Sequence, residues 1–167
     1  MDLETALLSA IAFEYRVRDH YVESARRVTD PRGQRVFTTL AREEQGHADY
    51  LAITLAHWKA NGTLPLDEFS ERQPGADWIR DAAVRITARN LPMAASHELP
   101  ELACLKQALV LERQTSAFYM DLVNGLEPGQ RMVFARFLDI EDGHAAMLQS
   151  EIEALEGAGN WQDVSGA

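Results

Sequence analysis

Apolar residues recur at alternating steps of three and four positions along four segments of the chain. This spacing is typical of amphipathic helices that bury one face in a bundle. Pro31 and Pro128 each follow an acidic residue and favour the start of a new helix. The pattern predicts helices at about residues 2–28, 31–60, 101–125 and 129–156. In the third of them the expected buried seam is Leu102, Leu105, Leu109, Glu112, Ser116, Tyr119 and Val123.

The first two predicted helices resemble the last two in sequence, so the chain contains an internal repeat. The segments "AIAFEYRVRDHYVES" and "ALVLERQTSAFYMDL" align with Glu14 opposite Glu112 and Tyr21 opposite Tyr119. At the start of the following helix, "PRGQRVF" resembles "PGQRMVF". Each repeat is typical of a helical hairpin. The sequence therefore predicts an all-α fold, a four-helix bundle of two hairpins at about 2–60 and 101–156.

Residues 61–100 separate the two predicted hairpins. Antiparallel neighbours need only a few connecting residues, so a connection this long indicates a crossover along the bundle. A crossover makes the second and third helices parallel and puts the two hairpin turns at opposite ends. We expect a short helix near 76–90 and no further helix in the tail, 157–167. The chain, 1–167, is expected to form one domain.

Six ionisable residues interrupt the apolar seams near the middle of the predicted helices. They are four glutamates and two histidines: Glu14, Glu44, His47, Glu112, Glu141 and His144. Burying a single carboxylate costs several kcal/mol at least. Two divalent metal ions would bring four positive charges against four negative ones. The pattern therefore predicts a site for two ions of iron, manganese or zinc. Without metal the four carboxylates repel one another, so Glu44→Ala is expected to melt no lower than the metal-free wild type.

At these residues the sequence resembles the ferritin-like superfamily and, within it, the rubrerythrin-related proteins. The resemblance is carried by "AIAFEYRVRDHY", "AREEQGHADYL", "ALVLERQTSAFY" and "FLDIEDGHAAML". It implies a ferritin-like four-helix bundle with a di-iron centre that reacts with O2 or H2O2. It also implies that the six residues named above are the metal ligands, with Glu44 and Glu141 bridging the two ions.

Three features depart from a rubrerythrin. Cys104 is the only cysteine, so the chain lacks a rubredoxin-like domain and electrons are expected from an external donor. Thr115 stands where rubrerythrins carry an additional glutamate, and His144 stands where they carry another one. The ligand set is closer to that of bacterioferritin.

Three functions fit this reading. The first is a ferroxidase or peroxide-scavenging oxidoreductase. The second is an iron-storage subunit, which in this superfamily requires a hollow cage and usually a fifth short helix that the tail does not resemble. The third is a non-redox metal-binding protein. Hydroxylation of an organic substrate would need a pocket that the sequence does not reveal.

Charge and hydropathy exclude other partners. The net charge of −10 and pI near 4.9 argue against nucleic acid. No basic amphipathic helix or apolar stretch of about 20 residues indicates a membrane. The N-terminus carries Asp2 and Glu4 where a secretory signal would be basic, so we expect a cytoplasmic protein.

Several other residues have two readings. Tyr21 and Tyr119 could hydrogen-bond a bridging carboxylate or be ordinary core aromatics. Glu43 is expected to be solvated, because its repeat equivalent is Ile140, and Cys104 is expected to be a buried small side chain. The apolar residues of 76–93 could cover the bundle or form the contact of the expected homodimer. The histidines without a glutamate partner are expected on the surface: His20, His57 and His97.

Overall fold

A computed structural model of the protein describes residues 2–64 and 100–158. These residues form four α-helices and no strand. The helices are α1 (Leu3–Arg27), α2 (Pro31–Asn61), α4 (Pro100–Gly125) and α5 (Pro128–Ala158). Their bounds agree closely with the predicted ranges, which confirms the all-helical assignment. The expected helix near 76–90, the apolar residues of 76–93, His97 and most of the tail lie outside the described residues.

Local signals in the sequence fix where the first two helices begin and end. The Asp2 carboxylate accepts a hydrogen bond from the backbone N–H of Thr5 at 2.9 Å, which caps α1. Asp30 does the same for α2. Helix α2 ends at Asn61 and is capped by Gly62, whose φ of 67° lies in the left-handed region that glycine adopts without strain.

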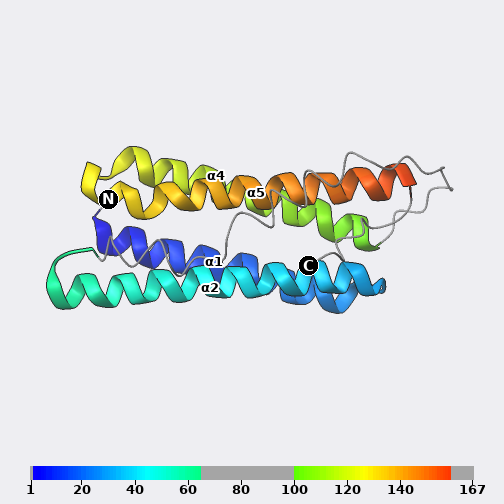
Figure 1. Ribbon diagram of the computed structural model, residues 1–167, viewed down its shortest axis with the longest axis horizontal. Helices are drawn as coiled ribbons and strands as arrows, with labels where there is room; N and C mark the ends of the chain where they lie inside the picture. The colour runs from blue at the N-terminus through cyan, green and yellow to red at the C-terminus, as the bar shows by residue number, and fades with distance from the viewer. Residues whose placement is uncertain (1, 65–99, 159–167) are drawn as a thin grey trace.

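The helices pack as two antiparallel pairs, α1 with α2 and α4 with α5, and the pairs meet through α1 and α4. Figure 1 shows that α2 and α4 run in the same direction and that the two hairpin turns lie at opposite ends of the bundle. The chain therefore leaves α2 at one end and enters α4 at the other, as a crossover connection requires. This arrangement confirms the expected topology of a four-helix bundle.

Two apolar clusters fill the bundle on either side of its middle. One contains Val17, Tyr21, Phe37, Leu105 and Leu148 among others. The other contains Leu7, Leu51, Tyr119, Phe134 and Phe137 among others. The polar residues of the predicted site come between these clusters along the helices. A low-dielectric wall therefore lies on both sides of the site.

The buried face of α4 differs from the predicted seam. Three of the seam residues are only half-buried: Leu102, Ser116 and Val123. The residue before each of these three is buried in its place, namely Glu101, Thr115 and Leu122, and Ala108 is buried as well. Helix α4 contacts both α5 and α1, so it buries a wider face than a single seven-residue seam supplies.

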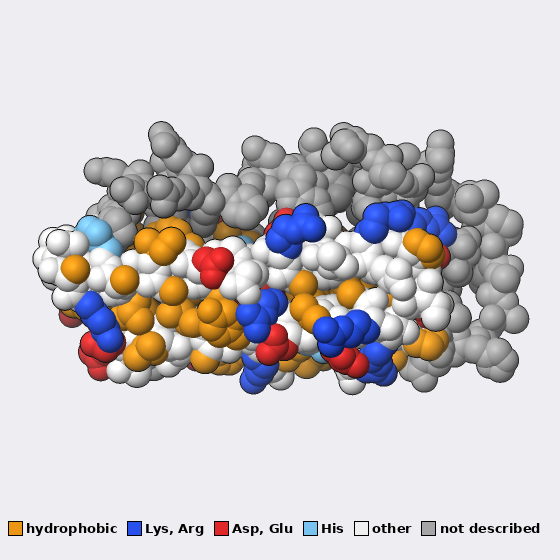
Figure 2. Space-filling model, turned by 90° about the horizontal axis from the view of Figure 1, so that it is seen from below, with side chains coloured by type: hydrophobic (Ala, Val, Ile, Leu, Met, Phe, Trp, Pro, Cys, Tyr) orange, Lys and Arg blue, Asp and Glu red, His pale blue; other side chains and the backbone are white. Residues whose placement is uncertain are grey.

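The outer surface mixes charged and apolar side chains. Figure 2 shows Lys and Arg beside Asp and Glu, with apolar side chains between them. Several large apolar residues are exposed, including Leu8 of α1 and Ile53 of α2. Among the described helices, none combines the length and the apolar character that crossing a membrane would take.

Candidate metal centre

The structure brings all six predicted ligands together at the middle of the bundle. Glu14 comes from α1 and Glu112 from α4, whereas α2 and α5 each contribute one Glu-x-x-His motif. Their atoms form two overlapping groups, within each of which the possible ligand atoms lie within 4.8 Å of one another. The first group is Glu14, Glu44, His47 and Glu141; the second is Glu44, Glu112, Glu141 and His144.

Glu44 and Glu141 belong to both groups, which is the position that a bridging carboxylate must occupy. Oε2 of Glu44 lies 3.1 Å from Nδ1 of His47, and Oε1 lies 3.0 Å from Nδ1 of His144. The two imidazole rings stack with their centroids 5.8 Å apart. Each oxygen of Glu44 therefore faces a different histidine, as two neighbouring metal positions would require.

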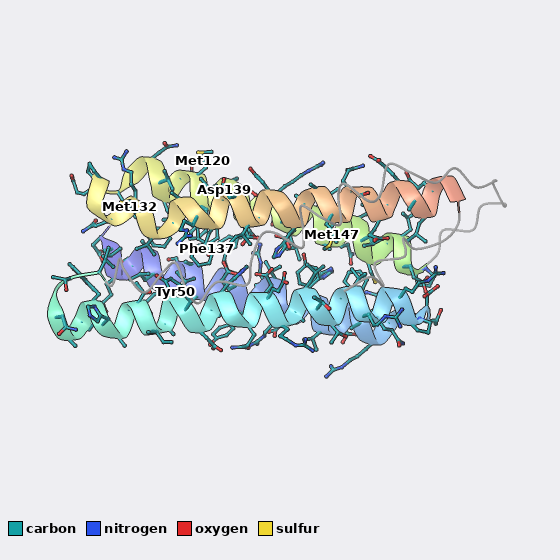
Figure 3. The ribbon with its side chains drawn as sticks, viewed as in Figure 1. Tyr50, Met120, Met132, Phe137, Asp139 and Met147 are labelled. Carbon is teal, nitrogen blue, oxygen red and sulfur yellow. The ribbon has the colours of Figure 1, made fainter. Side chains whose placement is uncertain are left out.

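The site is closed to water. Of the six residues, His47 is 4% exposed and the other five are 0% exposed. Figure 3 shows Phe137 and Met147 on either side of the middle of α5. Phe137 also contacts the ring of His47 edge-on at a centroid distance of 5.4 Å. Ionic interactions inside such an enclosure are stronger than they would be in water.

Several atoms that face this enclosure have no hydrogen-bond partner among the described residues. They are Oε1 of Glu44, Oε2 of Glu112, both carboxylate oxygens of Glu141 and Nδ1 of His144. The 3.0 Å contact between Nδ1 of His144 and Oε1 of Glu44 lacks the geometry of a hydrogen bond. In the part of the chain that the structure describes, no Lys or Arg pairs with the four carboxylates.

These orphaned atoms test whether the residues fit a metal. Leaving a buried donor or acceptor unsatisfied costs about 1–3 kcal/mol, and more when the group is charged. Oxygen and imidazole nitrogen atoms that converge without bonding one another are the donor set of iron, manganese or zinc. The buried Glu and His residues could therefore hold metal ions, and their composition fits two divalent ions better than any partner within the described residues.

Burial and mutual repulsion set the charges in the absence of metal. Burial raises the pKa of Glu14 and Glu112, and the neighbouring Glu141 raises both further. Burial opposes ionisation of Glu44 too, but His47 and His144 outweigh it and hold the pKa of this carboxyl below its usual range. The carboxyl groups that suffer from crowding are therefore Glu14 and Glu112 rather than Glu44, which corrects the expectation drawn from the sequence.

Both histidines have a raised pKa in this cluster. Burial by itself lowers the pKa of an imidazole, but the surrounding carboxylates, with Glu44 the strongest of them, together outweigh burial at His47 and at His144. A divalent metal ion would replace the proton on each Nδ1, because only a neutral imidazole can donate its lone pair. Metal binding at this site would therefore release protons.

Tyr21 and Tyr119 donate hydrogen bonds to carboxylates within the site. The expectation that they bond a carboxylate of the centre is therefore confirmed in part. The Tyr21 hydroxyl donates to Oε1 of Glu112, and the Tyr119 hydroxyl donates to Oε1 of Glu14. The expected acceptor was a bridging carboxylate, Glu44 or Glu141, and neither tyrosine donates to these two residues. Helices α1 and α4 are neighbours, so each tyrosine reaches across to the carboxylate of the other hairpin. Burial raises the pKa of both tyrosines, which keeps them protonated donors.

The expectation that Glu43 is solvated is wrong. Glu43 is buried at 9% exposure, and its Oε2 lies 3.0 Å from Nε2 of His144. Because α5 lies opposite this part of α2, the side chain meets the neighbouring hairpin instead of solvent. His20 is half-buried, with Nε2 3.4 Å from the backbone oxygen of Cys104. Cys104 itself is buried as expected.

Thr115 lies on α4, three residues after Glu112. It is buried, and its hydroxyl donates to the backbone oxygen of Leu111 at 3.0 Å. This position therefore adds no carboxylate to the centre.

A search of family models, curated proteins and solved structures found no match to this chain.

Proposed function

We propose that this protein is a dimetal carboxylate protein of the ferritin-like superfamily, related to the rubrerythrins, that reacts with O2 or H2O2. One observation carries the proposal: buried carboxylate and imidazole atoms converge in two groups that share Glu44 and Glu141, with no protein partner for several of them. Two divalent ions balance the charge of the four carboxylates. Iron is the proposed metal, and manganese and zinc suit the same donors.

Each residue has a role in this proposal. Glu14 and His47 would hold one ion, and Glu112 and His144 would hold the other. Glu44 and Glu141 belong to both groups of possible ligand atoms and would be shared by the two ions. Tyr21 orients the carboxylate of Glu112 by a hydrogen bond from the opposite hairpin, and Tyr119 does the same for Glu14.

Iron bound there as two Fe(II) ions would supply the two electrons that, with two protons, reduce one H2O2 to two molecules of water. The protein contributes position, charge balance and exclusion of water. With one cysteine in the sequence, the chain has no cluster-binding motif of its own, so repeated turnover takes electrons from an external donor.

Anaerobic loading with Fe(II), followed by addition of H2O2 or O2, tests the proposal. We expect two Fe(II) bound per chain and a near-ultraviolet absorption that grows after oxidant is added. The matched control is Glu141→Ala, which removes a shared ligand and is expected to show neither. Tight zinc binding without iron oxidation would identify a non-redox metal-binding protein. Retention of many irons per chain in a large particle would identify a storage subunit.

A further inference from the structure

The two histidines of the candidate centre have different surroundings on their outer sides. Nε2 of His144 lies 3.0 Å from Oε2 of Glu43, a carboxylate contributed by the other hairpin. The outer nitrogen of His47 has no carboxylate within ion-pair distance among the described residues. The repeat equivalent of Glu43 is Ile140, whose buried aliphatic side chain cannot accept a hydrogen bond. The internal symmetry of the chain is therefore broken at this point.

This difference acts on the metal positions through the ring of His144. When a metal ion displaces the proton on Nδ1, a carboxylate at Nε2 keeps the remaining proton on that nitrogen, so the lone pair of Nδ1 is directed at the centre. Nδ1 of His144 lies 3.6 Å from Oε1 of Glu112 and has no hydrogen-bond partner. The same carboxylate increases the basicity of the ring and fixes its orientation. His47 receives neither effect from the described residues.

We propose that Glu43 is a positioning residue that makes the two metal positions inequivalent, so that the position of Glu112 and His144 binds a divalent ion more tightly than that of Glu14 and His47. The inference rests on the proposed dimetal function and deepens it. Glu43 is buried and lies beside the imidazole of His144, which is fully buried. Loss of an outer partner of a metal-bound histidine typically weakens metal affinity about 10- to 100-fold.

The two positions can be measured one at a time. His47→Ala removes a terminal ligand from one position and leaves that of Glu112 and His144, whereas His144→Ala does the reverse. Mn(II) affinity of each variant is measured anaerobically, from the magnetic resonance signal of the free ion. Glu43→Gln is then added to both. It is nearly isosteric with the native residue, and Glu43→Ile, which copies the other repeat, serves as a second variant.

We expect the His47→Ala protein to bind Mn(II) more tightly than the His144→Ala protein. Glu43→Gln should weaken Mn(II) binding about tenfold or more in the His47→Ala background, and Glu43→Ile should weaken it further. In the His144→Ala background, Glu43→Gln and Glu43→Ile should each change Mn(II) affinity by less than about threefold, because only small indirect effects remain there. The exposed Glu23→Gln should change neither, and melting curves without metal check that each variant is folded.

A purely structural role for Glu43 predicts a different result, because it would weaken both positions alike. Equal losses in the two backgrounds, or no loss in either, would overturn the inference while leaving the dimetal proposal intact. A wild-type protein that binds no Mn(II) or Fe(II) would overturn the dimetal proposal, and the inference with it.

Discussion

Replacing Glu112 by glutamine in the metal-free protein should stabilise it at neutral pH. Burial and the neighbouring Glu141 raise the pKa of this carboxyl, so folding favours its protonated form. Glutamine has nearly the same shape as the protonated acid, and its amide oxygen can still accept the hydrogen bond from Tyr21. The substitution therefore keeps the packing and removes the need to take up a proton.

The size of the effect follows from the cost of protonation. Protonating a carboxyl with an ordinary pKa of 4.5 costs up to about 3 kcal/mol at pH 7, at 1.36 kcal/mol per pH unit. For a chain of this size that corresponds to a melting temperature higher by about 6–12 °C. Because the folded pKa is raised, the wild type keeps this stability below pH 4.5 and loses it as the pH rises. The gain from Glu112→Gln should therefore vanish near pH 4.

The assay is urea unfolding with a chelator present, at several pH values between 4 and 8. The matched variant is Glu44→Gln, which removes the carboxylate held between His47 and His144 and should be destabilising, by about 3–5 kcal/mol. The exposed Glu23→Gln should be neutral. If Glu112→Gln instead lost several kcal/mol at pH 7, Glu112 would be an ionised partner within the protein, and the reasoning about an uncompensated cluster would be refuted.

Three further predictions concern Tyr119, Glu101 and the effect of metal on stability. Tyr119→Phe leaves Oε1 of Glu14 without its donor and should lower the free energy of unfolding by about 1–3 kcal/mol, measured in urea. Burial raises the pKa of Glu101, but hydrogen bonds from Thr29 and from nearby backbone N–H groups together outweigh burial and lower it. Glu101→Gln should therefore cost about 1–2 kcal/mol above pH 5, and that cost should fade as the pH falls through the lowered pKa. Excess Mn(II) at 100 times its dissociation constant should stabilise the wild type by about 2.7 kcal/mol per site, and Glu141→Ala, which lacks a shared ligand, should lose this gain. Unchanged melting curves with metal would contradict the last prediction.

The sequence by itself determined the helices and the contents of the site. The helix limits depend on contacts within a few residues, such as the cap at Asp30 and the left-handed glycine at Gly62, so they can be read locally. The six candidate ligands could be found because each interrupts an apolar seam, and because the repeat places Glu14 and Glu112 at matching heights. Periodicity and repetition are properties of the chain before it folds.

The tertiary structure alone decided which side chains meet. The partners of Tyr21 and Tyr119 depend on α1 lying beside α4, and the buried face of α4 depends on its contacts with two helices at once. Glu43 looked solvated because its repeat equivalent is Ile140, yet it contacts His144 of the other hairpin. Such contacts depend on how each helix is rotated about its axis, and packing over the whole core sets that rotation. No local pattern in the sequence records it.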